Sequence, residues 1–131
     1  MPWQNTRKIR RQISQRNKMP GLIHSFKPII PNRPKVMILG SMPGPEALRK
    51  GEYYGFNGNY FWRIMGDLFG RSGLSDYFSK VKLLKANQIL LWDVIASCSR
   101  DGASDSRIQK VLPNKIEPLL KRYPGIRAIF L

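Results

Sequence analysis

An aromatic-rich segment spans residues 53–62 of this chain, where glycine and asparagine separate the rings. Flat aromatic faces can stack on a nucleic-acid base. Ordinary core packing is the alternative, and it is sufficient for Phe61, which falls on the apolar stripe of a predicted helix. Tyr53 and Tyr54 have no such periodic explanation, so stacking remains open for them.

Asn59 has two possible roles. It precedes the apolar stripe of the predicted helix, where asparagine is a common cap. Alternatively, its amide holds a water molecule or a base. The spacing alone favours the cap.

A second candidate segment comprises Gly40, Ser41, Met42, Pro43 and Gly44, directly after an apolar run. Its glycines let the backbone pass close to a ligand, and its N–H groups can bind a phosphate or a base edge. These five residues alone favour a plain strand-to-helix turn. They match neither the Walker nor the dinucleotide-binding pattern.

A third segment, residues 97–106, is rich in hydroxyl groups and includes Ser97, Arg100 and Ser104. These side chains are suited to contacting DNA phosphates. A solvated turn is an equal alternative. Nearby, Asp93 places a carboxylate in an apolar strand, which is unusual. It serves either as a catalytic group or, as we favour, as a hydrogen-bond partner of a neighbouring loop.

The chain has one histidine and one cysteine. Cys98 therefore forms neither an internal disulfide nor a cysteine-based zinc site, and we expect it to be a small buried residue. For His24 we favour a packing role over catalysis. The sequence predicts no metal site.

The predicted elements that position these residues alternate between strands and helices. Apolar runs predict strands at 35–39, 88–95 and 126–131, and periodicity predicts helices at 59–70, 75–85 and from 114 onward. Residues 96–104 are expected to form a loop, and residues 105–111 a short helix. This order predicts an α/β fold of three α/β/α layers around a central parallel sheet. Ligands bind such sheets at the carboxyl ends of the strands, where the loops at 40–59 and 96–104 lie.

The chain of 131 residues is long enough for one domain, which we place at 21–131. No apolar run approaches the roughly 18 residues of a membrane span. Lysine and arginine total 23 against 8 acidic residues, a net charge of +15. This charge favours nucleic acid as the partner, with an anionic membrane surface second. We interpret residues 1–20, which carry Arg7, Arg10 and Arg11, as a basic flexible arm; an organellar presequence is the alternative.

Several segments together resemble the hypoxanthine-DNA glycosylase family of the uracil-DNA glycosylase superfamily. Residues 38–44, 53–54 and 59–65 resemble its first motifs. Residues 91–98 together with 104–106 resemble the second conserved block of the family. Residues 24–26 resemble the segment that precedes its first strand, and residues 126–130 resemble its third strand.

The resemblance implies a DNA-repair enzyme that hydrolyses the bond between a deaminated base and deoxyribose, with no metal and no cofactor. It implies that Asn59 positions the water molecule and that Phe61 stacks on the flipped base. Gly40, Ser41, Met42, Pro43 and Gly44, together with Tyr53, would form the base pocket. Such an enzyme flips its target base out of the duplex.

Met42 occupies a position where the related mismatch-specific uracil glycosylases have the water-positioning asparagine, and the resemblance implies that Asn59 takes over this role. The chain departs from the hypoxanthine family pattern at two places. Phe56 and Asn57 stand where the family usually has a His-Pro pair. The family also continues past the third strand, so we expect a C-terminally truncated domain with an uncovered sheet edge.

Three functions therefore remain open: a glycosylase acting on hypoxanthine or uracil in DNA, a catalytically impaired DNA-binding remnant, and a small basic nucleic-acid-binding protein without that ancestry. We expect a monomer without membrane association. The absence of a secretory signal suggests a cytoplasmic, nucleoid-associated location.

Overall fold

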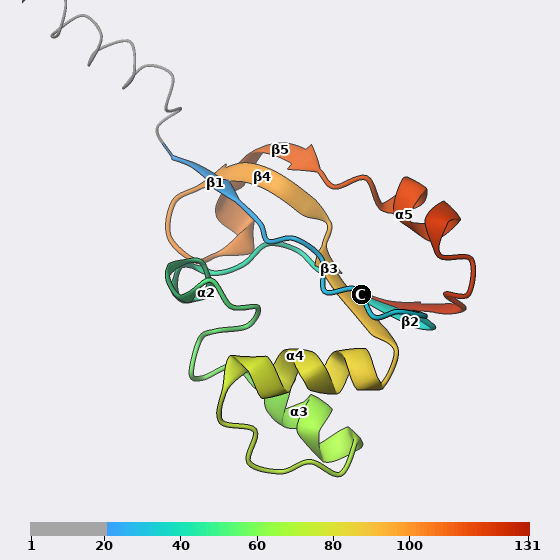
Figure 1. The fold of residues 1–131 in the computed structure, drawn as a ribbon. Helices are drawn as coiled ribbons and strands as arrows, with labels where there is room; N and C mark the ends of the chain where they lie inside the picture. The colour runs from blue at the N-terminus through green and yellow to red at the C-terminus, as the bar shows by residue number, and fades with distance from the viewer. Residues whose placement is uncertain (1–20) are drawn as a thin grey trace, which may run out of the picture.

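The computed structural model of the protein describes residues 21–131 (Figure 1). The predicted arm at 1–20, with Arg7, Arg10 and Arg11, lies outside these residues. The elements, in chain order, are β1 (Leu22–His24), β2 (Val36–Gly40), α2 (Pro45–Lys50), α3 (Phe61–Leu68), α4 (Tyr77–Ala86), β3 (Ile89–Asp93), β4 (Ile95–Arg100), a 3-10 turn (Asp105–Arg107), β5 (Ile108–Pro113), α5 (Ile116–Arg122) and β6 (Ala128–Phe130).

The predicted parallel sheet is present, with strand order β3-β2-β6. The register pairs Val36 with both Ile89 and Ala128, and ends with Gly40 opposite Asp93. Both β2 and β3 are short apolar runs, as expected for strands that are covered on both faces. The α/β fold class predicted from the sequence is therefore confirmed.

Helices cover both faces of this sheet. On one face, Leu84 of α4 and Trp62 of α3 pack in the same cluster as Leu91 of β3. On the other face, residues of α5 pack against Met37 and Leu90. The three-layer arrangement follows from this division, and Figure 1 shows α3 and α4 together on one side. Among residues 21–131, no helix combines the length and the apolar character that crossing a membrane requires.

A second, antiparallel sheet with strand order β1-β4-β5 was not predicted. The expected single strand at 88–95 breaks at Val94, whose N–H donates to the carbonyl of Gly40 at 2.8 Å. The chain then continues as β4, so the predicted loop at 96–104 was wrong over its first half. The predicted helix at 105–111 was also wrong, because a single 3-10 turn leads into β5. The serines of β4 lower the strand propensity of its sequence. The segment is nevertheless a strand, because β1 and β5 pair with it on either side.

The turn after α3 is held tightly against the helix. The N–H of Arg71 donates to the carbonyl of the buried Gly66 at 2.7 Å. A Cβ atom at position 66 would collide with the carbonyl oxygen of Arg71. This contact therefore requires glycine inside a helix, where that residue type is otherwise unfavourable.

We expect Gly66→Ala to lower the free energy of unfolding by about 1–2 kcal/mol, because overpacking outweighs the gain in helix propensity. Urea denaturation of the purified chain measures the change. Gly44→Ala is the control, since a Cβ there meets nothing within 4 Å. A Gly66→Ala variant as stable as the parent would contradict the close contact.

Candidate functional site

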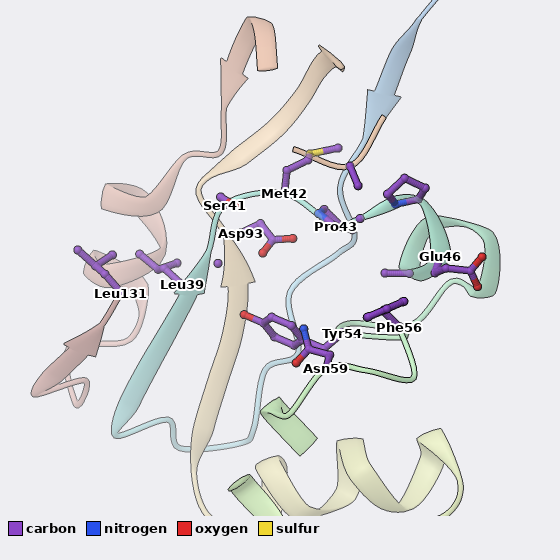
Figure 2. Close-up of a pocket in the computed structure, with 15 residues that line it drawn as sticks. Leu39, Ser41, Met42, Pro43, Glu46, Tyr54, Phe56, Asn59, Asp93 and Leu131 are labelled. Atoms are coloured by element: carbon purple, nitrogen blue, oxygen red, sulfur yellow. The ribbon is translucent and has the colours of Figure 1, made fainter. Parts of the chain in front are cut away.

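A cavity of about 660 Å³ opens at the carboxyl ends of β2 and β3 (Figure 2). This volume lies within the range of pockets that bind small ligands. Its lining comprises Leu39, Gly40, Ser41, Met42, Pro43, Gly44, Pro45, Glu46, Ala47, Tyr54, Phe56, Asn59, Asp93, Ala103 and Leu131. The structure thus brings together the predicted pocket loop 40–44 and Asn59.

Gly40 allows the closest approach in the site. A Cβ atom at this position would collide with the carboxylate of Asp93 and would lie 3.0 Å from the hydroxyl oxygen of Tyr54. Two polar groups from distant segments therefore converge on a backbone position that has no side chain. In Figure 2 the hydroxyl of Tyr54 points toward the strands that carry Gly40 and Asp93.

The carboxylate of Asp93 is buried, and its residue is only 4% exposed. Within the described part of the chain, its Oδ2 atom has no hydrogen-bond partner. Burial is the main cause that raises the pKa of Asp93 to about 6, and the charge of Asp105 adds to it. The sequence favoured a hydrogen bond from this side chain to a neighbouring loop. Instead, it is the main-chain carbonyl of Asp93 that accepts a bond, from the amide of Asn114 at 2.7 Å.

The two adjacent tyrosines have different roles. Tyr53 is 3% exposed, and its hydroxyl donates to the carbonyl of Lys27 at 2.8 Å. The indole N–H of Trp62 donates to the Tyr53 carbonyl at 2.7 Å. Tyr53, predicted as a pocket residue, therefore anchors the core and does not line the cavity. Its neighbour Tyr54 lines the cavity instead.

The ring of Tyr54 is supported from behind by Phe61. The two rings stack with a centroid distance of 4.1 Å. Phe61 does not line the cavity, so its predicted contact with a base stays a prediction, whereas Tyr54 presents a ring to the pocket. The backbone of Tyr54 has φ of 53°, a left-handed conformation that is rare for a tyrosine. Phe56, which is 59% exposed, adds a second aromatic wall.

Asn59 lies one position before Tyr60, which is the N-cap of α3 in place of the predicted Asn59, and it also lines the cavity. Its Oδ1 atom accepts a hydrogen bond from the N–H of Phe61 at 2.8 Å, at the start of α3. Because Oδ1 faces that donor, the Nδ2 amide group is the part of the side chain that can point into the cavity, which Asn59 lines. Asn59 can therefore accept a hydrogen bond from the first N–H group of α3 and face the cavity at the same time; its predicted contact with a water molecule or a base stays a prediction.

Two of the three residues predicted to contact phosphates in segment 97–106 have buried side chains in the structure. The side chain of Arg100 is 1% exposed, and its Nη2 atom donates to the carbonyl of Pro43 at 2.6 Å. Arg100 thus ties β4 to the pocket loop and does not form a DNA-facing surface. Ser97 is likewise buried, at 5% exposure. Of the three predicted residues only Ser104 is exposed, and its hydroxyl pairs with that of Ser106 at 2.7 Å.

A second contact closes the pocket loop from the same side. The hydroxyl of Ser41 donates to Oδ2 of Asp105 at 2.6 Å. Cys98 is fully buried and packs with Met42 and Ile95, whereas His24 is exposed. Within residues 21–131, no three His, Cys, Asp or Glu side chains group so that they could hold a metal ion.

Comparison with known proteins identifies a family. The family model described as "Uracil DNA glycosylase superfamily" matches residues 27–130. Two curated relatives named "Hypoxanthine DNA glycosylase" are 36% and 41% identical, from Methanosarcina barkeri and Methanosarcina acetivorans respectively. Each alignment covers 79% of this chain and 66% of the relative, so the chain spans just under two thirds of their length.

A solved structure is also similar. It is the solution NMR structure of a protein from Methanosarcina acetivorans that is described as a candidate uracil DNA glycosylase. The TM-score is 0.73 at 38% identity, covering 82% of this chain and 68% of that one.

The raised pKa of Asp93 predicts how stability depends on pH. The folded protein favours the neutral carboxyl group, so this stabilisation is present below the ordinary pKa near 3.8 and is lost as pH rises through about 6. We expect Asp93→Asn to exceed the parent in unfolding free energy by up to about 3 kcal/mol at pH 7.5, and by much less at pH 4.

Urea denaturation of both proteins at the two pH values measures this difference. The comparison with the parent at each pH cancels the contributions of the other titrating groups. A stability difference that does not grow with pH would show that the carboxylate is not buried as described.

Proposed function

Because the chain belongs to the uracil-DNA glycosylase superfamily, we propose that it hydrolyses the N-glycosidic bond of deaminated bases, hypoxanthine or uracil, in DNA. This is a base-excision repair activity. The proposal rests on the cavity at the ends of two parallel strands, where an asparagine amide and aromatic rings meet a buried carboxylate. The Oδ2 atom of this carboxylate has no hydrogen-bond partner among residues 21–131. The names of the two curated relatives support the same activity.

The cavity is suited to a base that has been flipped out of the stack. A base inside a duplex is out of reach of an enzyme, so it must rotate into a pocket. The rings of Tyr54 and Phe56 replace part of the lost stacking, an effect worth about 1–3 kcal/mol per base. Since Phe61 fixes the Tyr54 ring from behind, this wall is already formed before the base arrives.

In the reaction, the bond between C1′ and the base nitrogen breaks and its electron pair leaves with the base. The sugar becomes an oxocarbenium-like cation. The water oxygen bonds to C1′ of this cation, and the proton that the water loses is taken up by the departing base. The Nδ2 amine of Asn59 orients this water, and the backbone N–H groups of residues 40–44 stabilise the negative charge on the departing base. The carboxylate of Asp93 accepts a hydrogen bond from an N–H group of the base, which satisfies its Oδ2 atom. No metal or cofactor takes part in this scheme.

We propose damaged DNA as the partner of a monomeric protein, acting in the cytoplasm at the nucleoid. The net charge of +15 supports sequence-independent attraction to phosphates. The basic residues Arg7, Arg10 and Arg11 of the arm at 1–20 contribute to it, ahead of the catalytic domain at 21–131. Ser104 is exposed and follows Ala103, which lines the cavity, and we propose that its hydroxyl contacts a phosphate.

A second candidate function is DNA binding without excision. Phe56 lines the cavity, and together with Asn57 it occupies the place of the His-Pro pair expected from the family pattern. An aromatic ring cannot replace the hydrogen bonds of an imidazole. The excision assay below separates the two candidates.

We expect Asn59→Ala and Asn59→Asp both to lower excision by roughly 100-fold or more, because both remove the amine that orients the water. Asn59→Asp keeps the oxygen that accepts from the N–H of Phe61, so it should retain the stability of α3. Asn59→Ala should lose about 1 kcal/mol of stability. Alkali cleavage of a labelled duplex carrying one hypoxanthine or uracil measures excision, and gel shift measures binding.

Full activity in Asn59→Asp together with loss in Asn59→Ala would mean that Asn59 acts only as a helix cap. Binding without excision by the parent chain would favour the second candidate function.

A further inference from the structure

A polar groove of about 650 Å³ runs beside the cavity. Tyr54, Phe56 and Asn59 line both, so the groove begins at the wall of the proposed base pocket. It continues along α3 and the turn between α3 and α4, which lie together in Figure 1.

Positive charge dominates the lining of this groove. Lys50, Arg63, Arg71 and Lys80 line it, against two acidic residues, Glu52 and Asp67. Among the described residues, none of the four cations lies in an ion pair. Cations that are outside ion pairs and outnumber the acidic residues of a polar groove favour binding of a chain of phosphates.

Hydrogen bonds of the structure fix the backbone of Arg71 and the side chain of Lys50. Arg63 projects from α3, and the N–H of Arg71 bonds to Gly66 one turn further along the same helix. Lys50 donates from Nζ to the carbonyl of Gly55 at 2.8 Å and to Oδ1 of Asn57 at 3.1 Å, which fixes the loop at the mouth of the groove. Lys50 therefore shapes the groove, whereas Arg63 and Arg71 are exposed and free to bind a ligand.

We propose that this groove binds the phosphodiester backbone that flanks the flipped nucleotide, through Arg63 and Arg71. The inference rests on the proposed function, since it assigns the route of the damaged strand away from the base pocket. A strand that leaves the cavity past Phe56 and Asn59 enters the groove directly, with its phosphates on the cationic wall.

The test compares two double variants that remove the same charge. Arg63→Gln with Arg71→Gln removes both groove guanidinium groups. Arg33→Gln with Arg127→Gln is the control, because both residues are exposed and line neither the cavity nor the groove. Affinity for a duplex with a tetrahydrofuran abasic site is measured over a range of salt concentrations.

For the groove variant, we expect affinity to fall roughly tenfold near 0.1 M salt and the slope of log K against log salt to decrease by about 1.5–2. The control should change by less than half as much. The two single groove variants should each show about half of the effect. Thermal unfolding midpoints within about 3 °C of the parent establish that the variants fold.

Equal losses in the two double variants would overturn the inference, since net charge alone would then account for binding. An unchanged salt slope in the groove variant would overturn it as well. If the parent excises the base and the two double variants bind DNA equally well, the proposed function stands and the proposed role of the groove is wrong. If the parent does not excise the base, but the salt slope decreases only in the groove variant, the proposed function is wrong and the groove still binds phosphates.

Discussion

The parallel pairing that sets Gly40 opposite Asp93 is the constraint on which the site depends. Because Gly40 lacks a side chain, the carboxylate at the end of β3 can lie against the backbone of β2. Beyond this pair, Val94 and Ile95 bond to the carbonyls of Gly40 and Ser41, and the chain turns into the second sheet. A shift of one residue in this register would remove the carboxylate from the cavity and misdirect the loop that follows β2.

Much of the framework could be predicted from the sequence because it depends on local patterns. The apolar runs before Gly40 and before Asp93 mark two buried strands, and they pair as expected. The apolar spacing from Phe61 to Leu68 marks α3. Since loops after parallel strands gather at one edge of a sheet, the placement of residues 40–44 near Asn59 also followed from topology.

The rest depends on contacts between distant residues, which no local pattern encodes. Arg100 looks like a surface cation, yet its partner is the carbonyl of Pro43, 57 positions away. Tyr53 and Tyr54 are chemically identical neighbours, and only the loop conformation decides which ring faces the cavity. The serines of β4 resemble a solvated loop until β1 and β5 pair with it on either side. Likewise, the lack of a hydrogen-bond partner for Oδ2 of Asp93 within residues 21–131 becomes visible only once the surrounding residues are placed.

Tyr54 shows how a sequence can depart from what its backbone prefers. Glycine or asparagine adopts φ near 53° at lower energy than an aromatic residue does. A design procedure that optimised this chain for stability alone would therefore replace Tyr54, and the same procedure would neutralise Asp93. Both replacements would stabilise the fold but would remove an aromatic ring and a carboxylate that line the cavity. Thermostable versions of this scaffold should consequently be sought at positions remote from β2 and β3, with these two residues held fixed.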